Sequence, residues 1–194
     1  MVSDQELNEF LHHLNSIHPL SSDSHRVLME LVTFIPAEKQ EILQPIGKTC
    51  RTIYFVHHGA ARIYYYKEEK DVTEYFAFDR DIIIRAESLF TGKPSNKGIQ
   101  AIEPTTFVAL AADPLFGLFD LHRDIERLFY KLVEKSYCDT LQRLEHLQFR
   151  TAEERYRVLM SQAPRIIQKI PLKYIASYLG ITQVSLSRIR AQLG

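Results

Sequence analysis

The last 25 residues, 170–194, constrain the fold more than any other stretch, because they combine two short helices with a tight turn. The first helix is expected over 172–179, and the second, capped by Thr182, extends toward Gln192. Ala176 is the small residue that crossing helices need where they approach, and Gly180 tolerates the left-handed backbone of the turn. The residues spaced to pack between the two helices are Ile175, Leu179, Ile181, Leu186 and Ile189. The segment therefore predicts a helix-turn-helix.

The second helix of such a unit enters the DNA major groove, where its early exposed residues meet base edges. Gln183 can pair with adenine, Arg188 with guanine or a phosphate, and Val184 can contact a thymine methyl group. The expected base-reading set is Thr182, Gln183, Val184, Ser185 and Arg188, while Lys169, Lys173 and Arg190 are placed for phosphates. An ordinary helical hairpin with a basic surface is the alternative interpretation.

The charge distribution favours DNA as a partner. The chain has 24 basic and 24 acidic side chains, yet residues 151–194 hold seven basic and two acidic ones. The remaining 150 residues hold 17 basic and 22 acidic side chains. A basic end on a mildly acidic body indicates an anionic partner for that end.

A long helix is predicted before the basic end, over 123–149. Apolar residues recur every three or four positions for six turns, at Ile125, Leu128, Phe129, Leu132, Val133, Tyr137, Leu141, Leu144 and Leu147. This stripe needs a partner, either the rest of the chain or the same helix of a second copy in a homodimer. Thr151 and Glu154 form a capping box that opens a further helix over 152–161, so a hinge is expected near Arg150.

The first 112 residues predict helices followed by a small β-structure. Helices are expected after Ser3 and over 24–33. Short β-rich segments separated by turn signals follow at 52–56, 61–66, 72–78, 82–84, 98–102 and 106–111. Such a series is typical of a small sandwich or barrel.

Several classes of protein are excluded by the composition. The apolar runs are far shorter than the roughly 20 residues of a membrane span, and the acidic N-terminus does not predict an export signal. Cys50 and Cys138, the only cysteines, cannot form a four-thiolate metal site. The sequence contains no nucleophile elbow, phosphate loop or dinucleotide fingerprint, so we expect a cytoplasmic protein that is not an enzyme.

Two clusters of side chains are candidates for a binding site. His57 and His58 are adjacent in the sequence, and adjacent strand residues point to opposite faces, so no metal site is expected there. Tyr64 and Tyr66 share a strand face and could line an effector cavity, although packing in the core is the alternative.

Taken together, residues 5–194 resemble the CRP/FNR family of bacterial transcription regulators. The resemblance is carried mainly by KYIASYLGITQVSLSRIR and more weakly by FVHHGAARIYYY and IQAIEPTTFVAL. It implies an α+β fold with an N-terminal cyclic-nucleotide-binding-like β-roll (1–122), a long dimerisation helix with its hinge (123–150) and a helix-turn-helix domain (151–194). It also implies that an effector held by the β-roll reorients the DNA-binding domains of a homodimer, with RNA polymerase as a further partner.

The sequence departs from the family at its effector cassette. Glu87 matches the acid that binds a nucleotide ribose, but no glycine precedes it and no arginine occupies the region of Ser95 and Asn96. Lys93 or Lys97 could supply a charge there but not the bidentate fork of arginine. Cyclic nucleotide is therefore not expected as the effector. The candidate effector-binding residues are Tyr64, Tyr66, Glu87, Ser88, Ser95 and Asn96.

Two further departures concern the chain ends. The N-terminal cysteine cluster of the oxygen-sensing members is missing, and the β-wing that usually follows the recognition helix is largely absent. The alternative function is accordingly a ligand sensor or protein-interaction module whose DNA-binding end is vestigial.

Overall fold

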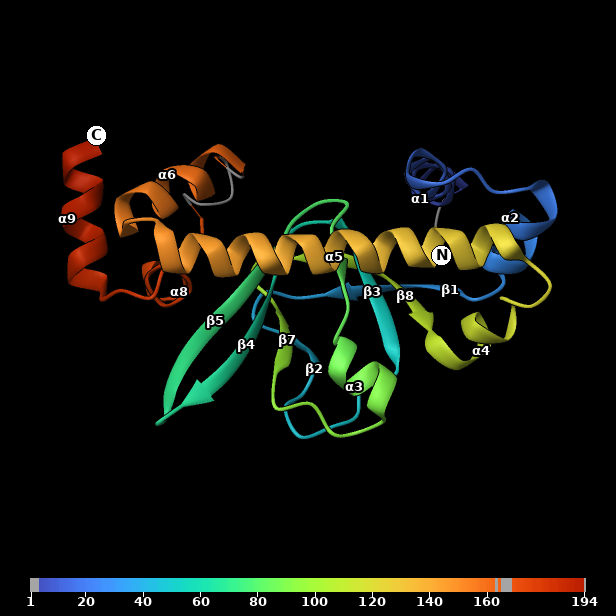
Figure 1. Ribbon diagram of the computed structural model, residues 1–194, viewed down its shortest axis with the longest axis horizontal. Coiled ribbons are helices and arrows are strands. Elements are labelled where there is room, and N and C mark those ends of the chain that lie inside the picture. The colour runs from blue at the N-terminus through green and yellow to red at the C-terminus, as the bar shows by residue number, and fades with distance from the viewer. Residues whose placement is uncertain (1–3, 163, 165–168, 194) are drawn as a thin grey trace.

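The computed structural model describes residues 4–162, 164 and 169–193. A β-roll lies against one long helix, α5 (Arg123–Phe149), which runs the length of the molecule (Figure 1). Two N-terminal helices, α1 (Asp4–Ile17) and α2 (Ser22–Met29), lie at one end of α5. The C-terminal helices lie at the other end: α6 (Ala152–Gln162), α8 (Leu172–Tyr178) and α9 (Gln183–Leu193). This is the predicted order of β-roll, long helix and helix-turn-helix.

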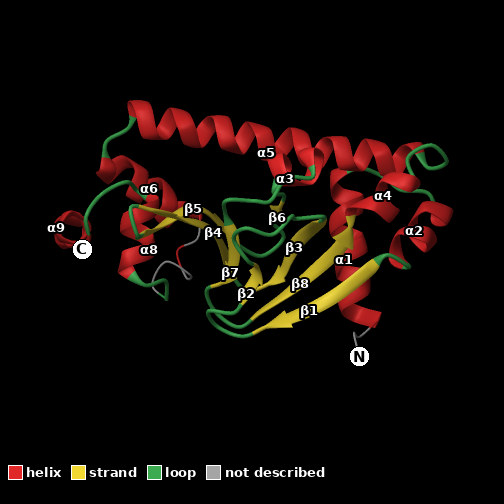
Figure 2. Cartoon of the chain, turned by 90° about the horizontal axis from the view of Figure 1, so that it is seen from below, coloured by secondary structure: helices red, strands yellow, loops and turns green. Residues whose placement is uncertain are grey.

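The β-roll consists of two four-stranded antiparallel sheets (Figure 2). One sheet has the order β1 (Val32–Ala37), β8 (Thr105–Ala111), β3 (Thr52–His58) and β6 (Ile82–Ile83). The other has the order β2 (Ile42–Gln44), β7 (Gly98–Ala101), β4 (Ala61–Lys67) and β5 (Lys70–Ala77). Buried side chains from both sheets, including Val56, Ile63, Ile99 and Phe107, form one core cluster. Two short helices, α3 (Ala86–Thr91) and α4 (Ala112–Gly117), complete the domain.

The structure corrects the predicted helix over 24–33. Ser21 caps α2, since its hydroxyl accepts a hydrogen bond from the Ser24 N–H at 3.1 Å, and the helix ends at Met29. Val32 and Thr33 pair with Leu110 and Ala109 of β8 instead. The backbone hydrogen bonds of the sheet therefore outweigh the helical spacing of the apolar residues. The cap predicted at Ser3 lies outside the described residues.

A second core cluster holds α5 to the β-roll and to the N-terminal helices. Its buried members include Phe10, Leu14 and Leu28 from α1 and α2, and Ile125, Leu128 and Leu132 from α5. The stripe that the sequence predicted on α5 is thus buried over its first three turns by the chain itself. Farther along, Tyr137, Leu141 and Leu144 are 64%, 41% and 51% exposed.

The chain turns sharply after α5, because Arg150 adopts an extended backbone conformation. The capping box at the start of α6 is confirmed: the Thr151 N–H donates to the Glu154 carboxylate at 2.7 Å, and the Glu154 N–H donates to the Thr151 hydroxyl at 3.2 Å. Within the described residues, no helix combines the length and the apolar character that crossing a membrane requires.

Candidate nucleic-acid interface and ligand cavity

The turn between α8 and α9 has the geometry that the sequence predicts. Gly180 has a φ of +69°, and the Ile181 N–H donates to the Ala176 carbonyl at 3.0 Å, which closes the end of α8. Ile175, Leu179 and Leu186 are fully buried between the helices. The apolar contact and the left-handed turn together fix how α9 projects from α8.

Thr182 is the cap of α9. Its hydroxyl accepts from the Ser185 N–H at 3.1 Å and lies 3.0 Å from the Ser185 hydroxyl. Thr182 and Ser185 therefore hold the helix start, while Gln183 and Arg188 are exposed and Val184 is 62% exposed.

Ser187 belongs to the same exposed face of α9. It lies four residues after Gln183 and three after Val184, so the three side chains are neighbours on one helix surface. The sequence analysis chose Thr182, Gln183, Val184, Ser185 and Arg188 and did not include Ser187, which helical periodicity places beside Gln183 and Val184.

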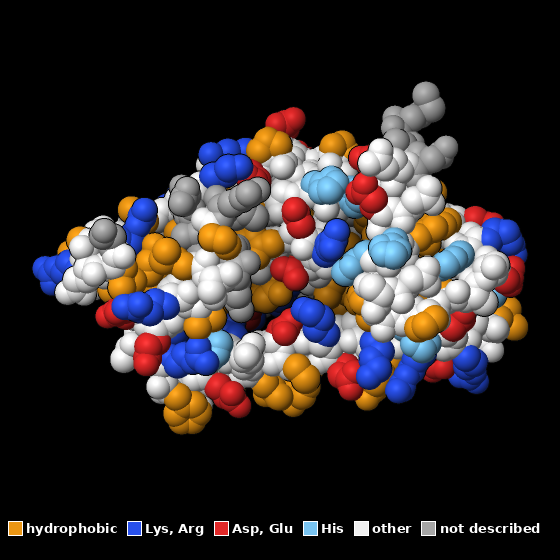
Figure 3. All heavy atoms as spheres, turned by 90° about the horizontal axis from the view of Figure 1, so that it is seen from above, with side chains coloured by type: hydrophobic (Ala, Val, Ile, Leu, Met, Phe, Trp, Pro, Cys, Tyr) orange, Lys and Arg blue, Asp and Glu red, His pale blue; other side chains and the backbone are white. Residues whose placement is uncertain are grey.

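Basic side chains surround α9. Lys173 and Arg190 are exposed, and the end of the molecule that α9 forms carries Lys and Arg side chains (Figure 3). Lys169 lies 3.5 Å from the Glu103 carboxylate of the β-roll, so part of its charge is compensated within the chain.

The helix-turn-helix packs on the β4–β5 hairpin of the same chain. The Arg62 guanidinium, only 2% exposed, lies 3.7 Å from the centre of the Tyr174 ring on α8. It also donates to both carboxylate oxygens of Asp71, at 2.5 and 2.7 Å. The Thr73 N–H donates to the Ser177 hydroxyl of α8 at 3.1 Å. Because α8 makes these contacts, α9 is left at the outer end of the molecule (Figure 1).

A cavity of about 500 Å³ lies between the β-roll and the second half of α5. Ile82, Ile83 and Ile84 give it an apolar wall. Charged side chains line it as well: Glu74, Arg85, Glu87 and Lys97 from the β-roll side, and Asp139 and Arg143 from α5. Burial raises the pKa of the Tyr75 hydroxyl in this wall, so the hydroxyl stays protonated and able to donate a hydrogen bond. The cavity suits a small molecule with an apolar body and a charged group.

Arg85 is one of several charged lining residues that the sequence analysis missed. Its Nη1 atom lies 3.5 Å from the Glu74 carboxylate, which Lys97 also contacts. Its Nε atom is buried and has no hydrogen-bond partner among the described residues. The sequence contains a signal for this role. Arg85 directly follows three isoleucines at the end of a buried strand, where a charged side chain is costly to bury without a partner.

Of the candidate effector-binding residues, Glu87 lines the cavity, and the other five do not. The Ser88 hydroxyl accepts from the Cys50 N–H at 2.8 Å, and the Ser95 hydroxyl donates to the Lys97 carbonyl at 2.8 Å, so both hold loops. Tyr64 is buried with its ring 5.9 Å from that of Tyr66, which is 61% exposed. Asn96 is exposed.

The expectation that His57 and His58 point to opposite faces is wrong. A bulge in β3 places one extra residue between Val56, opposite Phe107, and His58, opposite Thr106. The two imidazole rings consequently lie 4.2 Å apart. One ligand atom from each histidine and one from Glu9 lie within 4.8 Å of one another.

The arrangement of an eight-stranded β-roll, a long helix and a terminal helix-turn-helix defines the CRP/FNR fold. Solved structures share it. FixK2 from Bradyrhizobium japonicum matches with a TM-score of 0.72 and 19% identity, over 84% of each chain. A regulator described as CRP/FNR family from Eubacterium rectale matches at 0.70 and 18%, over 89% of this chain and 83% of that one. A CooA mutant from Carboxydothermus hydrogenoformans matches at 0.68 and 20%, over 99% and 85%.

Two comparisons at the level of sequence found no match for the chain. No family model matches it, and no curated protein does. The likeness to the solved structures therefore establishes the fold.

Proposed function

We propose that the protein is a DNA-binding transcription regulator that senses a small molecule. The observation that carries this proposal is the helix-turn-helix, whose second helix presents an exposed polar face at one end of the molecule. Such a helix fits the major groove of B-DNA. A regulator of this kind acts in the cytoplasm, on double-stranded DNA and alongside RNA polymerase.

The proposed contacts divide into two groups. Gln183 and Arg188 read adenine and guanine edges, and Val184 contacts a thymine methyl group. Lys173 and Arg190 contact phosphates, which add affinity without sequence choice. Thr182 and Ser185 contribute by capping α9 (hydroxyl oxygens 3.0 Å apart) and so by fixing its start at the groove.

We further propose that the protein is a homodimer whose seam is the exposed stripe of α5. Tyr137, Leu141 and Leu144 recur at intervals of four and three residues, the spacing of a coiled-coil seam. Hydrophobic side chains project along the edge of the molecule where α5 runs (Figure 3). The proposed division is then a sensor domain over 1–122, a dimerisation helix with its hinge over 123–150 and a DNA-binding domain over 151–194.

The proposed effector occupies the cavity between the β-roll and α5. The buried Arg85 Nε–H, which has no partner in the part of the chain that the structure describes, offers a donor there, and Lys97 adds a second positive charge near Glu74. These groups favour an effector with an anionic group beside an apolar body. An effector in this cavity contacts both the β-roll and the helix that leads to the DNA-binding domain, so its binding can shift their relative orientation.

DNA selection tests the function directly. Purified protein is mixed with random duplexes, bound molecules are sequenced, and affinity for the selected site is measured by fluorescence anisotropy. We expect an inverted repeat with half-sites about one helical turn apart. Arg188→Ala should weaken binding to that site by about 1–3 kcal/mol. The matched control is Arg157→Ala, which removes an exposed arginine from α6 that pairs with Glu153 at 2.8 Å.

The salt dependence separates this function from the alternative. A regulator that neutralises phosphates loses affinity steeply as salt rises. A ligand sensor or protein-interaction module with a vestigial end shows no duplex affinity even at low salt and with candidate anionic effectors present. Equal affinities of Arg188→Ala and the unchanged protein for the selected site would contradict the assignment of α9.

A further inference from the structure

The bulge at the end of β3 creates a cluster of metal-ligating side chains outside both sites described above. His57 is 8% exposed, and His58 follows it on the same side of the strand. Gly59 comes next with a φ of +110°, and a Cβ atom there would lie 2.6 Å from the Thr105 hydroxyl. A side chain at position 59 is therefore excluded, and this close approach of β3 and β8 fixes the bulge.

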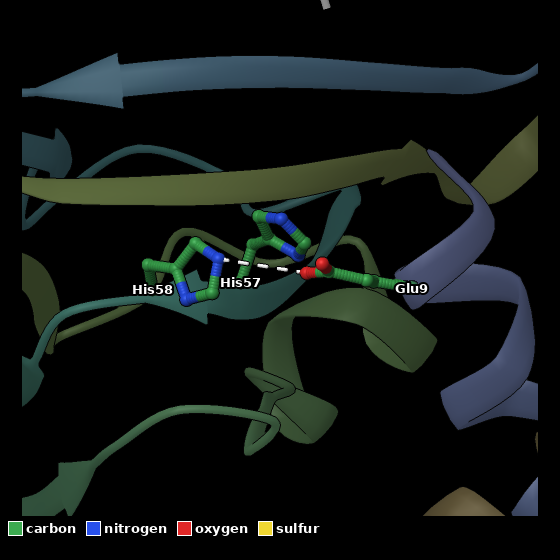
Figure 4. A group of neighbouring side chains, drawn as sticks. All are labelled: Glu9, His57 and His58. Carbon is green, nitrogen blue, oxygen red and sulfur yellow. Dashed lines mark ion pairs between the residues drawn. The ribbon is translucent and has the colours of Figure 1, made fainter. Parts of the chain in front are cut away.

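Glu9 completes the cluster from a different element (Figure 4). It lies on α1, whose register is set by its neighbour Phe10, packed edge-on against Phe55 of β3 with ring centres 5.2 Å apart. This packing brings the Glu9 carboxylate 3.8 Å from the His58 Nε2 atom. Glu9 also accepts a hydrogen bond from the Gln5 side chain at 3.0 Å.

The distances suit a single ion. Zinc binds imidazole nitrogen at about 2.0–2.1 Å, so tetrahedral ligand atoms lie about 3.3 Å apart. The three ligand atoms lie within 4.8 Å of one another. The His58 and Glu9 side chains are 61% and 48% exposed. Both can therefore rotate toward His57 and bring their ligand atoms to the shorter spacing of a zinc site. The buried His57 ring provides a fixed ligand.

Acidic and basic side chains both lie around the cluster. Glu6, Glu9 and Asp79 all act electrostatically on His57, and Arg80 is the basic side chain of the same hollow. His13, one helical turn after Glu9, also lines this hollow. Histidine side chains gather on this face of the molecule among acidic and basic ones (Figure 3).

We propose that Glu9, His57 and His58 form a binding site for a borderline divalent transition-metal ion such as Zn²⁺. Two imidazoles and one carboxylate are ligands that such ions prefer, and three protein ligands leave coordination positions open for water. The ion would join α1 to the end of β3. Since Phe10 and Leu14 of α1 pack in one cluster with Ile125 of α5, metal binding would also stabilise the junction between the β-roll and the long helix.

The test uses the full chain without an affinity tag, stripped of metal with a chelator. Zn²⁺ binding is measured by equilibrium dialysis with elemental analysis, and Co²⁺ binding by visible absorption. We expect one ion per chain, bound at least tenfold more weakly by Glu9→Gln and by His58→Gln. Both substitutions change exposed side chains, so the variants should fold, which circular dichroism verifies. Zn²⁺ should raise the Tm of the unchanged protein more than that of either variant.

His12→Gln is the matched control, because His12 is an exposed histidine on α1 outside the cluster. This variant should bind as the unchanged protein does. The site is disproved if the unchanged protein binds no more metal than the Glu9→Gln/His58→Gln double variant. Equal weakening by His12→Gln would also overturn the assignment.

Discussion

At the scale of single residues, Gly180 has the most demanding backbone position in the helix-turn-helix. Its φ of +69° lies in the left-handed region, while a Cβ atom there would meet no atom within 4 Å. The need for glycine is therefore conformational and not steric.

Replacing Gly180 tests this distinction. Gly180→Ala should lower the free energy of unfolding by about 1 kcal/mol through backbone strain alone. Gly180→Asn should cost less, because asparagine adopts this conformation more readily. Urea unfolding of the three proteins measures both effects. If Gly180→Ala left the free energy of unfolding unchanged, the turn would have relaxed away from the left-handed region.

Residues whose roles depend on near neighbours in the sequence were predictable, and residues whose roles depend on distant contacts were not. The roles of Ala176, Gly180 and Thr182 were predictable, because each depends on contacts within a few residues along the chain. The pairing of His57 with His58 was not, because the bulge depends on the approach of β3 to Thr105, 46 residues after Gly59. Alternation along a strand holds only where the ladder is regular.

At the scale of elements, Asp124 joins α2 to the start of α5. Its carboxylate accepts from the Ser21 N–H at 2.7 Å and from the Ser24 hydroxyl at 2.6 Å. Burial raises the pKa of Asp124, but these hydrogen bonds more than offset it and lower the pKa to about 2. The charged carboxylate therefore stabilises the folded state.

The lowered pKa of Asp124 predicts how the free energy of unfolding depends on pH. A carboxylate with a folded pKa below its unfolded value of about 3.9 stabilises the fold fully above pH 4 and loses that contribution as the pH falls toward 2. Asp124→Asn puts an amide donor where a hydrogen-bond acceptor is needed. It should lower the unfolding free energy by about 1–2 kcal/mol at pH 7, with the difference shrinking between pH 4 and pH 2.

Denaturant titrations across this range measure the effect. The exposed Asp120→Asn, four residues earlier, is the control and should leave stability unchanged. A constant difference between Asp124→Asn and the unchanged protein down to pH 2 would argue against a charge-dependent contribution.

Elements with a long periodic signal were predictable, and short edge strands were not. The bounds of α5 match the prediction. Apolar residues recur every three or four positions along its 27 residues, and among the regular structures only an α-helix places such residues on one face. The strands β1 and β2 were missed. β1 contains Pro36, which normally weakens a strand prediction, but β1 pairs only with β8 at the edge of its sheet, where proline is tolerated.

At the scale of the whole molecule, the exposed stripe of α5 predicts the oligomeric state. The double variant Leu141→Glu/Leu144→Glu places like charges at the proposed seam. It should convert a dimer into a monomer and weaken binding to a two-fold DNA site by at least tenfold, because each half-site then binds independently. Light scattering coupled to size-exclusion chromatography measures the mass.

The control for the seam is Leu121→Glu. Leu121 is 81% exposed in the loop before α5, so the substitution adds a charge at an exposed leucine away from the stripe. It should remain a dimer. A dimeric Leu141→Glu/Leu144→Glu protein would place the interface elsewhere.

The packing of α8 on the β4–β5 hairpin has a consequence for temperature. Phe76 of β5 and Tyr178 of α8 lie in contact, with ring centres 4.9 Å apart, within a core cluster that both parts of the chain share. Moving α8 off the hairpin would hydrate these rings, and hydrating apolar surface has a positive heat-capacity change. Cooling therefore weakens this contact, as it weakens other hydrophobic contacts. The contact between α8 and the β4–β5 hairpin is therefore expected to loosen on cooling, with no ligand involved.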